Sequence, residues 1–368
     1  MSNREGADGR GPGQLASTPG AHSLAEILSQ PRYWSECLNH LQQRDTAAGI
    51  RELLGDAGEW LFIGCGSSYY IALAAAAVWT AVTGMKARAF PASEILLFPE
   101  LVLAGSSKPA AALISRSGST SETVRAAEVL KQKRVRTLAV TCTEGNPLQE
   151  LTSCSLALPP CDEQSTVMTR SFTSLLLGLQ FLASGWAQNQ KLTENIGKLP
   201  ELAAPGLKNL GSRIQEFVDA RQFEDYVCLG QGPFYGLACE TALKITEMST
   251  SYAQSFHTLE FRHGPKSIVS PETLVIFLLS EQGYSAECDL LEESKGLGGT
   301  TISITNRADA RARASSDLSI EFGFDLPELA RIVPYIFAGQ LIGLYTGLKK
   351  GLDPDNPRHL TRVVMLNE

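Results

Sequence analysis

The chain has 368 residues, of which 43% are hydrophobic and 7% aromatic, a balance typical of a soluble globular protein. This length favours two domains of moderate size over one compact core. The net charge is −7, and a small basic cluster at 131–136 falls near the end of a predicted helix, where cations are favoured anyway. We therefore expect neither a nucleic acid nor an anionic membrane as a partner.

The cysteines and histidines show no metal-binding pattern. None of the eight cysteines forms a Cys-x-x-Cys pair, and the five histidines lack metal-ligand spacing. We expect reduced thiols and no metal. The start of the chain lacks the apolar core of a signal peptide, and the longest apolar stretch, 71–82, is shorter than the roughly 20 residues that span a bilayer. These features predict a cytoplasmic protein.

The first half of the chain alternates short apolar runs with helical patterns. Residues 1–22 are rich in Gly, Pro, Ser and charge and predict a disordered tail. Ser23 is a plausible N-cap for a helical segment over 23–48. Strand, turn and helix then alternate, which indicates a parallel sheet covered by helices on both faces. The predicted strands are 60–63, 110–114, 137–141 and 154–158, and the predicted helices are 69–82 and 121–133.

The same order of elements recurs in the second half. Gly230 follows Gly64 by 166 residues, Ser280 follows Ser115 by 165, and a matching strand follows 164 residues after its counterpart. Constant offsets favour two copies of one α/β module, although chance alignment of apolar strands is an alternative. We expect domains at 49–200 and 210–350, a boundary near 192–209 and a C-terminal tail at 351–368.

Two turns at one sheet edge carry candidate ligand groups. The loop 115–120 places hydroxyl groups around Gly118 between a strand and a helix, where helix N–H groups favour an anion. A Ser-rich N-cap is the alternative, and spacing alone does not decide. The turn 64–68 lacks the third glycine of a dinucleotide fingerprint, because Tyr69 stands there. We expect this turn to form a second wall of the same site.

The second half carries two clusters of charged residues. Glu240, Lys244 and Glu247 fall on one helical face at spacings of four and three. Such a face is usually an exposed salt-bridged surface, but apolar neighbours here predict burial, and buried charges favour a function. Residues 260–266 gather charges around His263 before a Gly-Pro pair. The alternative there is a salt-bridge cluster between domains or subunits.

These motifs, in this order and together with the segment 355–358, resemble those of proteins with two tandem SIS (sugar isomerase) domains. The likeness runs from Ser23 to near the end of the chain. It is similar to the isomerase half of glucosamine-6-phosphate synthase and to the tagatose-6-phosphate ketose/aldose isomerase group, which includes amino-sugar-phosphate deaminases. The resemblance implies an α/β fold in which each domain is a parallel-sheet α-β-α sandwich, flavodoxin/Rossmann-like.

The resemblance also implies roles for single residues. Glu247 matches the carboxylate that moves a proton between C1 and C2 of the sugar, and Lys244 matches the cation beside it. His263 matches the ring-opening histidine, which in the synthase comes from the partner subunit, so a homodimer with shared active sites is implied. No cofactor is required. The implied sugar-phosphate contacts are Gly66, Ser67, Ser68, Ser115, Arg116, Ser117, Thr120, Thr166 and Arg362, with the C-terminal tail closing the site.

The chain departs from the synthase pattern at informative positions. Arg116 replaces a Gln, Arg362 replaces a Lys, and the short N-terminal tail leaves no room for a glutaminase domain. These differences favour isomerisation or deamination of a hexose or hexosamine 6-phosphate without glutamine as the nitrogen donor. A non-catalytic sugar-phosphate sensor built on the same domains is the alternative. The pattern does not predict the stereochemistry of the sugar.

Overall fold

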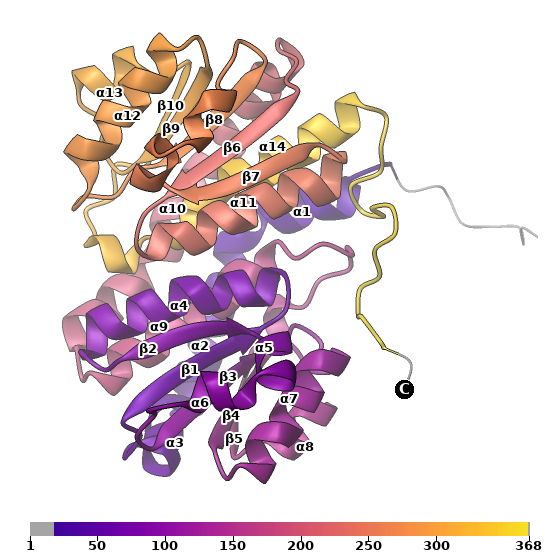
Figure 1. The fold of residues 1–368 in the computed structure, drawn as a ribbon, viewed down its shortest axis with the longest axis vertical. Coiled ribbons are helices and arrows are strands. Elements are labelled where there is room, and N and C mark those ends of the chain that lie inside the picture. The colour runs from indigo at the N-terminus through magenta and orange to yellow at the C-terminus, as the bar shows by residue number, and fades with distance from the viewer. Residues whose placement is uncertain (1–17, 367–368) are drawn as a thin grey trace, which may run out of the picture.

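The computed structural model describes residues 18–366, so most of the predicted tail at 1–22 lies outside the described residues. Two α/β units lie one above the other, each with a five-stranded sheet between helices (Figure 1). The first unit comprises β1 (Glu59–Gly64), α4 (Ser67–Thr83), β2 (Ala87–Pro91), α5 (Ala92–Leu97), α6 (Pro99–Leu103), β3 (Pro109–Ile114), α7 (Ser121–Gln132), β4 (Arg136–Thr141), α8 (Pro147–Leu151), β5 (Cys154–Ala157), η1 (Pro159–Cys161) and α9 (Arg170–Trp186).

The second unit follows the same sequence of strands and helices. It comprises β6 (Asp225–Gly230), α11 (Pro233–Ser249), β7 (Tyr252–His257), η2 (Leu259–Arg262), η3 (Pro265–Ile268), β8 (Thr273–Leu278), α12 (Tyr284–Gly296), β9 (Thr300–Thr305), α13 (Ala310–Ala314), β10 (Leu318–Glu321), η4 (Glu328–Ala330), η5 (Val333–Ile336) and α14 (Phe337–Lys349). Four more helices frame the two units: α1 (Ala21–Leu28), α2 (Gln30–Gln43), α3 (Thr46–Leu54) and α10 (Gln190–Asp219).

The two sheets share one topology. Their strand orders are β2-β1-β3-β4-β5 and β7-β6-β8-β9-β10, and every pairing is parallel. The turn after the first strand also has one backbone conformation, with Gly66 at φ 54°, ψ −127° and Gly232 at φ 55°, ψ −128°. Positive φ of this kind favours glycine. The α/β fold and the recurring order of elements are therefore confirmed.

Alternation along the strands divides the core into layers. In β1, Trp60 and Phe62 join a large central core, whereas Leu61 and Ile63 pack under α5, α7 and α8 on the outer face. Side chains of a strand point alternately to opposite faces, so a sheet buried on both sides reads as a continuous apolar run. The central core runs through both units, and the outer face of the second sheet packs under α12 and α13.

Helices α4 and α11 face each other where the two units meet (Figure 1). Their backbones approach closely at Gly236, where an added Cβ would lie 2.6 Å from the carbonyl oxygen of Tyr70. On the other side of α11, an added Cβ at Gly343 of α14 would lie 2.7 Å from the carbonyl oxygen of Lys244. The first contact fixes α11, the helix of the second unit that carries the charged cluster, against the first unit, and the second fixes it against α14 of its own unit.

One local expectation from the sequence needs correction. Ser23 does not cap a helix: α1 begins at Ala21 after Gly20, and the Ser23 hydroxyl donates to Asp355 Oδ1 at 2.6 Å. The polar segment 192–209, where the sequence predicts the domain boundary, belongs to the continuous helix α10, which connects the two units and contains Pro200 and Pro205. Packing of its apolar face against α2, α9 and α14 holds this helix together. In the described part of the chain, no helix combines the length and apolar character needed to cross a membrane.

Candidate functional site

A cavity of about 190 Å³ opens at the carboxyl edge of the first sheet. Open parallel sheets bind their ligands at this edge. Four parts of the chain meet here: the turn after β1, the loop after β3, the segment before α9 and the C-terminal segment, with one residue from α11. Its lining residues are Cys65, Gly66, Ser67, Ser68, Ile114, Arg116, Ser117, Thr120, Thr123, Thr166, Val167, Met168, Glu247, Leu360, Thr361, Arg362 and Val364.

The loop after β3 is organised by its own hydroxyl groups. Gly118, at φ 66°, donates its N–H to Ser115 Oγ at 3.1 Å, and that oxygen lies 3.2 Å from Thr120 Oγ1. Ser117 Oγ accepts the N–H of Ser119 at 3.1 Å. Ser115 is buried and stabilises the loop through these hydrogen bonds, whereas Ser117 and Thr120 line the cavity.

Two helices begin at this cavity. Helix α4 begins at Ser67 and α7 begins at Ser121, directly after the two turns that line it. A helix start carries unpaired N–H groups and the positive end of the helix dipole. Together with the neutral hydroxyls, the two starts make the cavity a suitable place for a phosphate group.

Arg116 points its guanidinium into the protein framework. It is 5% exposed, pairs with Glu163, and donates to the carbonyl oxygens of Thr166 and Arg362, each at 3.0 Å. Glu163 in turn accepts hydrogen bonds from the backbone N–H groups of Thr169 and Ser171. Arg116 lines the cavity and also connects the segment before α9 and the C-terminal segment to the loop.

The C-terminal segment runs from the second unit along the first (Figure 1). Its fixed points are Asp355, whose carboxylate accepts N–H groups of α1, and Val364, whose carbonyl accepts the N–H of Ser121 at 3.2 Å. Arg362 pairs with Asp162 through its side chain, which is 43% exposed. The segment thus lines one side of the cavity.

Glu247 reaches the cavity from α11 and is backed by a buried ion cluster. Its side chain is 18% exposed and pairs with Lys244, which is fully buried. Lys244 Nζ also lies 3.3 Å from Glu240 Oε1 and donates to Ser67 Oγ at 3.2 Å. The prediction that this face is buried is confirmed. Lys244 does not line the cavity, so its charge acts through Glu247 and Ser67.

The cluster perturbs the proton affinity of its members. Burial raises the pKa of Glu240 to about 8 against the opposing effect of Lys244. Burial alone would lower the pKa of Lys244, but the carboxylates of Glu240 and Glu247 outweigh it, and the pKa is raised. The ammonium of Lys244 is therefore retained at neutral pH. Of the two acids in the cluster, Glu247 is the one that lines the cavity.

His263 lies at another edge of the molecule. It lines a separate hollow with Gln231, His257 and Glu260, at the carboxyl ends of β6 and β7, near the start of α11. Glu247 lies at the end of α11, about 21 Å further along at 1.5 Å per residue. One chain therefore does not bring His263 to its own Glu247.

Comparison with known proteins identifies the family. The SIS domain model matches residues 53–185 and 221–323, which is more than half of the chain. The chain belongs to the SIS domain family. The two matched stretches fall on the two parallel sheets, so this SIS protein has the fold that the sequence motifs implied.

Relatives of this SIS protein include enzymes of sugar-phosphate chemistry. A glutamine–fructose-6-phosphate aminotransferase of Thermococcus kodakarensis is 25% identical over 93% of this chain, which spans 57% of that relative's length. A Streptomyces coelicolor protein, provisionally named a D-galactosamine-6-phosphate deaminase, is 27% identical over 94% of both chains. The crystal structure of glucosamine-6-phosphate deaminase from Thermotoga maritima superposes with a TM-score of 0.75 at 28% identity, covering 94% of this chain and all of that one.

Several residues of the site were not predicted from the sequence. Thr123 lines the cavity and Glu163 pairs with Arg116, and neither was assigned to the site. Glu240 was noticed as part of a charged face but not assigned to the site, although its spacing to Lys244 was a usable signal. Nothing in the local sequence around Glu163 distinguishes it from a surface carboxylate, because its partners come from distant segments.

Proposed function

We propose that this SIS protein is a phosphosugar isomerase or deaminase that acts on a hexose or hexosamine 6-phosphate. The observation that carries the proposal is the entry of Glu247, from the second unit, into a cavity of the first unit that is lined by hydroxyls and two helix starts. A phosphate at Ser117 and Thr120 would hold the sugar, and Glu247 would face its other end. The names of the relatives support the same chemistry.

The proposed reaction starts from the ring-opened aldose. Glu247 removes the proton on C2, and the electron pair forms the C1–C2 double bond of an enediol or enolamine while O1 takes up negative charge. The ammonium of Lys244 favours this state through Ser67 and pairs with Glu247. Returning the proton to C1, while a proton passes from O2 to O1, gives the ketose. With an amino group on C2, the product is a ketimine, and water converts it to ketose 6-phosphate and ammonia.

Ring opening requires a proton donor and acceptor, and no histidine is among the described residues that line the cavity. His263 has the side chain for that role, but it lies near the opposite end of α11 from Glu247. We infer that the protein is a homodimer in which His263 of one chain completes the cavity of the other. The eight cysteines, all free, are in keeping with a reducing compartment, and we infer a cytoplasmic location.

An activity assay tests the proposal directly. Glucosamine 6-phosphate and galactosamine 6-phosphate are offered to the protein, and ammonia and ketose phosphate are measured. Tagatose, fructose and glucose 6-phosphates test isomerisation without deamination. We expect turnover of at least one substrate. Saturable binding without any turnover would instead support the sugar-phosphate sensor.

Glu247→Gln is the sharpest variant for the chemical step. We expect turnover to fall by roughly a hundred- to ten-thousand-fold, the usual contribution of a general base, while sugar-phosphate binding persists. Glu292→Gln is the matched control, because Glu292 is exposed and pairs with Arg311 far from the cavity. If Glu247→Gln keeps full activity, the assignment of the base is wrong.

Mixing two inactive variants tests the shared site. Equal amounts of Glu247→Gln and His263→Ala are unfolded and refolded together, so that mixed dimers form. Each mixed dimer has one cavity with both residues intact, and about a quarter of the wild-type activity should return, as expected for two-fold symmetry. Lack of any recovery, with mixed dimers present, would contradict a histidine donated by the partner.

A further inference from the structure

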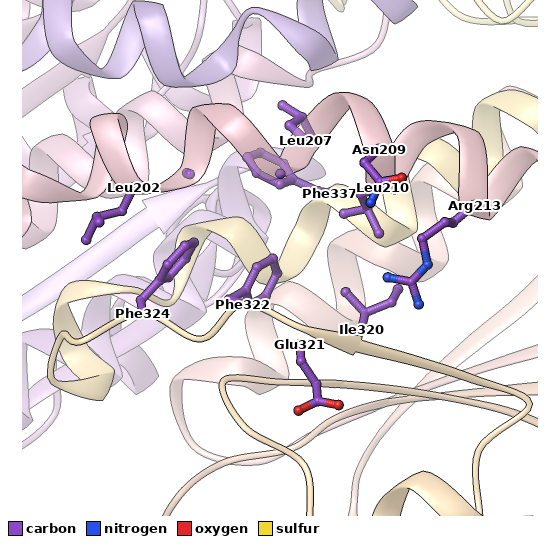
Figure 2. Close-up of a pocket in the computed structure, with 12 residues that line it drawn as sticks. Leu202, Leu207, Asn209, Leu210, Arg213, Ile320, Glu321, Phe322, Phe324 and Phe337 are labelled. Carbon is purple, nitrogen blue, oxygen red and sulfur yellow. The ribbon is translucent and has the colours of Figure 1, made fainter.

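A second cavity, of about 210 Å³, lies between α10 and the segment that follows β10 (Figure 2). No residue of the sugar-phosphate cavity contributes to it. Its volume far exceeds what one water needs and suits a small organic molecule. The lining residues are Leu202, Ala203, Gly206, Leu207, Asn209, Leu210, Arg213, Ile320, Glu321, Phe322, Phe324 and Phe337.

The inner wall of this cavity is apolar and aromatic. Ile320, Phe324 and Phe337 are buried, and Phe322 stacks on Phe324 with ring centroids 5.3 Å apart. Leu202 of α10 also lines the cavity and remains 42% exposed. Aromatic rings gain most from a flat or branched apolar group packed against them. The inner wall therefore favours an aryl or branched-alkyl body.

The polar lining leaves a positive charge available. Glu321 is already matched, because Arg313 donates two hydrogen bonds of 2.8 Å to its carboxylate and Ala308 N–H a third at 3.0 Å. Arg213, on the opposite side, has a single acceptor among residues 18–366, the carbonyl oxygen of Ser319 at 2.9 Å. A guanidinium carries five N–H donors. Arg213 thus keeps donors and charge for an anionic group on a ligand.

Helix α10 is locally weakened where it borders the cavity. Pro205 lies inside the helix and cannot donate to the carbonyl four residues earlier. Gly206 follows it, and a Cβ added there would meet nothing within 4 Å. A proline and a glycine in mid-helix are costly and mark a place where the helix can bend. A molecule in the cavity would contact this part of α10.

Direct contacts connect this cavity to the sugar-phosphate site. Phe337 stacks on Trp34 at 5.3 Å, and Trp34 Nε1 donates to Thr173 Oγ1 at 2.9 Å. One turn beyond Phe337, Gln340 donates to the carbonyl oxygen of Thr169 at 3.1 Å. Thr169 directly follows the residues 166–168 that line the sugar-phosphate cavity. A ligand that shifts Phe337 would therefore act on that wall.

We propose that the cavity between α10 and the segment after β10 binds a small carboxylate or similar anion with an aryl or branched-alkyl body, and that this ligand modulates anion binding at the loop 115–120. The body packs on Phe322, Phe324 and Phe337, and the anionic group meets Arg213. The binding site stands independently of the reaction that the protein catalyses. The modulation is assigned to the phosphate site, which can be measured with inorganic phosphate alone.

Calorimetric titration of the full-length protein with naphthalene-1-acetate tests the site. We expect saturable binding with one site per chain, and about tenfold weaker binding of the neutral naphthalene-1-acetamide, because a charge-assisted hydrogen bond is lost. Gly206→Leu should abolish binding by filling the cavity. Gly197→Leu is the matched control, since it is a glycine of the same helix with open space at its Cβ but outside the lining.

Two further measurements test whether Arg213 recognises the anionic group and whether the ligand modulates phosphate binding. Arg213→Gln should remove the preference for the carboxylate over the amide. Saturating naphthalene-1-acetate should change the Kd for inorganic phosphate by about fivefold or more, the usual lower range of coupling between sites. We expect this change in the wild type and in Gly197→Leu but not in Gly206→Leu. Equal binding to both glycine variants would overturn the site, and an unchanged phosphate Kd would overturn the modulation. Neither result depends on whether the sugar chemistry is assigned correctly.

Discussion

The loop after β3 and its counterpart after β8 have the same framework. In the first, Gly118 N–H donates to Ser115 Oγ at 3.1 Å; in the second, Gly283 N–H donates to Ser280 Oγ at 2.9 Å. Both loops stand between a central strand and a helix at the carboxyl edge of a parallel sheet. The geometry of an anion site is therefore present twice in the molecule.

The two loops differ in what occupies them. In the second, Glu287 of α12 is completely buried, and its carboxylate accepts the N–H of Ser280 at 2.7 Å and the Ser280 hydroxyl at 3.1 Å. In the first, the corresponding Glu122 lies at the second position of α7 and is partly exposed. Helix α12 begins two residues earlier relative to the repeat, so Glu287 is its fourth residue and turns inward. The side chain of Glu287 thus occupies the second loop, whereas the first loop lines an open cavity.

The largest effect should come from removing hydroxyls that only the first loop offers to a ligand. We expect Ser117→Ala with Thr120→Ala to weaken inorganic phosphate binding and raise the KM for the sugar phosphate by tenfold or more, since a hydrogen bond to a charged group contributes about 1.5–3 kcal/mol. Titration calorimetry and steady-state kinetics measure the change. Ser280→Ala should leave both values unchanged, and a matching loss in that variant would erase the distinction between the loops.

An intermediate effect should follow from emptying the second loop. Glu287→Ala leaves the Ser280 N–H and hydroxyl without their carboxylate and should cost about 1–3 kcal/mol of unfolding free energy. Phosphate should then restore part of the melting temperature by binding in its place. The measurement is made with Ser117 and Thr120 both changed to Ala, at constant ionic strength. Glu287→Gln keeps the space filled and serves as the control. If phosphate stabilises both variants equally, it does not bind in the place of the Glu287 side chain.

The smallest effect should appear in the pH dependence of stability. Burial raises the pKa of Glu287 to about 7 from the ordinary carboxyl value of 4.5. The folded state then binds more protons than the unfolded state between these values, so this contribution is complete below 4.5 and is lost as the pH rises through 7. Denaturant unfolding from pH 5 to 8 should show a steeper fall for wild type than for Glu287→Gln. Parallel curves would contradict the raised pKa.

Sequence patterns predicted the central strands but missed three edge strands. β1, β3, β6 and β8 are buried on both faces and appear as apolar runs, which are easy to recognise. β2 and β7 are largely half-exposed, and β10 has one buried residue, so their residues mix polar and apolar types. Edge strands obtain their conformation from the neighbouring strand, and that partner is not visible in a local sequence window.

Within the site, sequence identified the groups but not always their orientation. The loop 115–120 and Glu247 meet as expected, because the repeat and the resemblance together implied one shared site. Arg116 was assigned to the ligand, whereas its partners are Glu163 and carbonyl groups of distant segments. A guanidinium beside a phosphate loop can either bind the ligand or hold neighbouring segments of the protein together. The choice between them depends on which acceptors the tertiary fold brings within reach.

The placement of Glu247 makes the first cavity depend on both units. Its loop 115–120 belongs to the first unit, whereas Glu247 comes from α11 of the second unit, which packs against α4. Because one chain carries both units, the carboxylate stays at the cavity without any need for association. The corresponding loop of the second unit is filled by Glu287 instead.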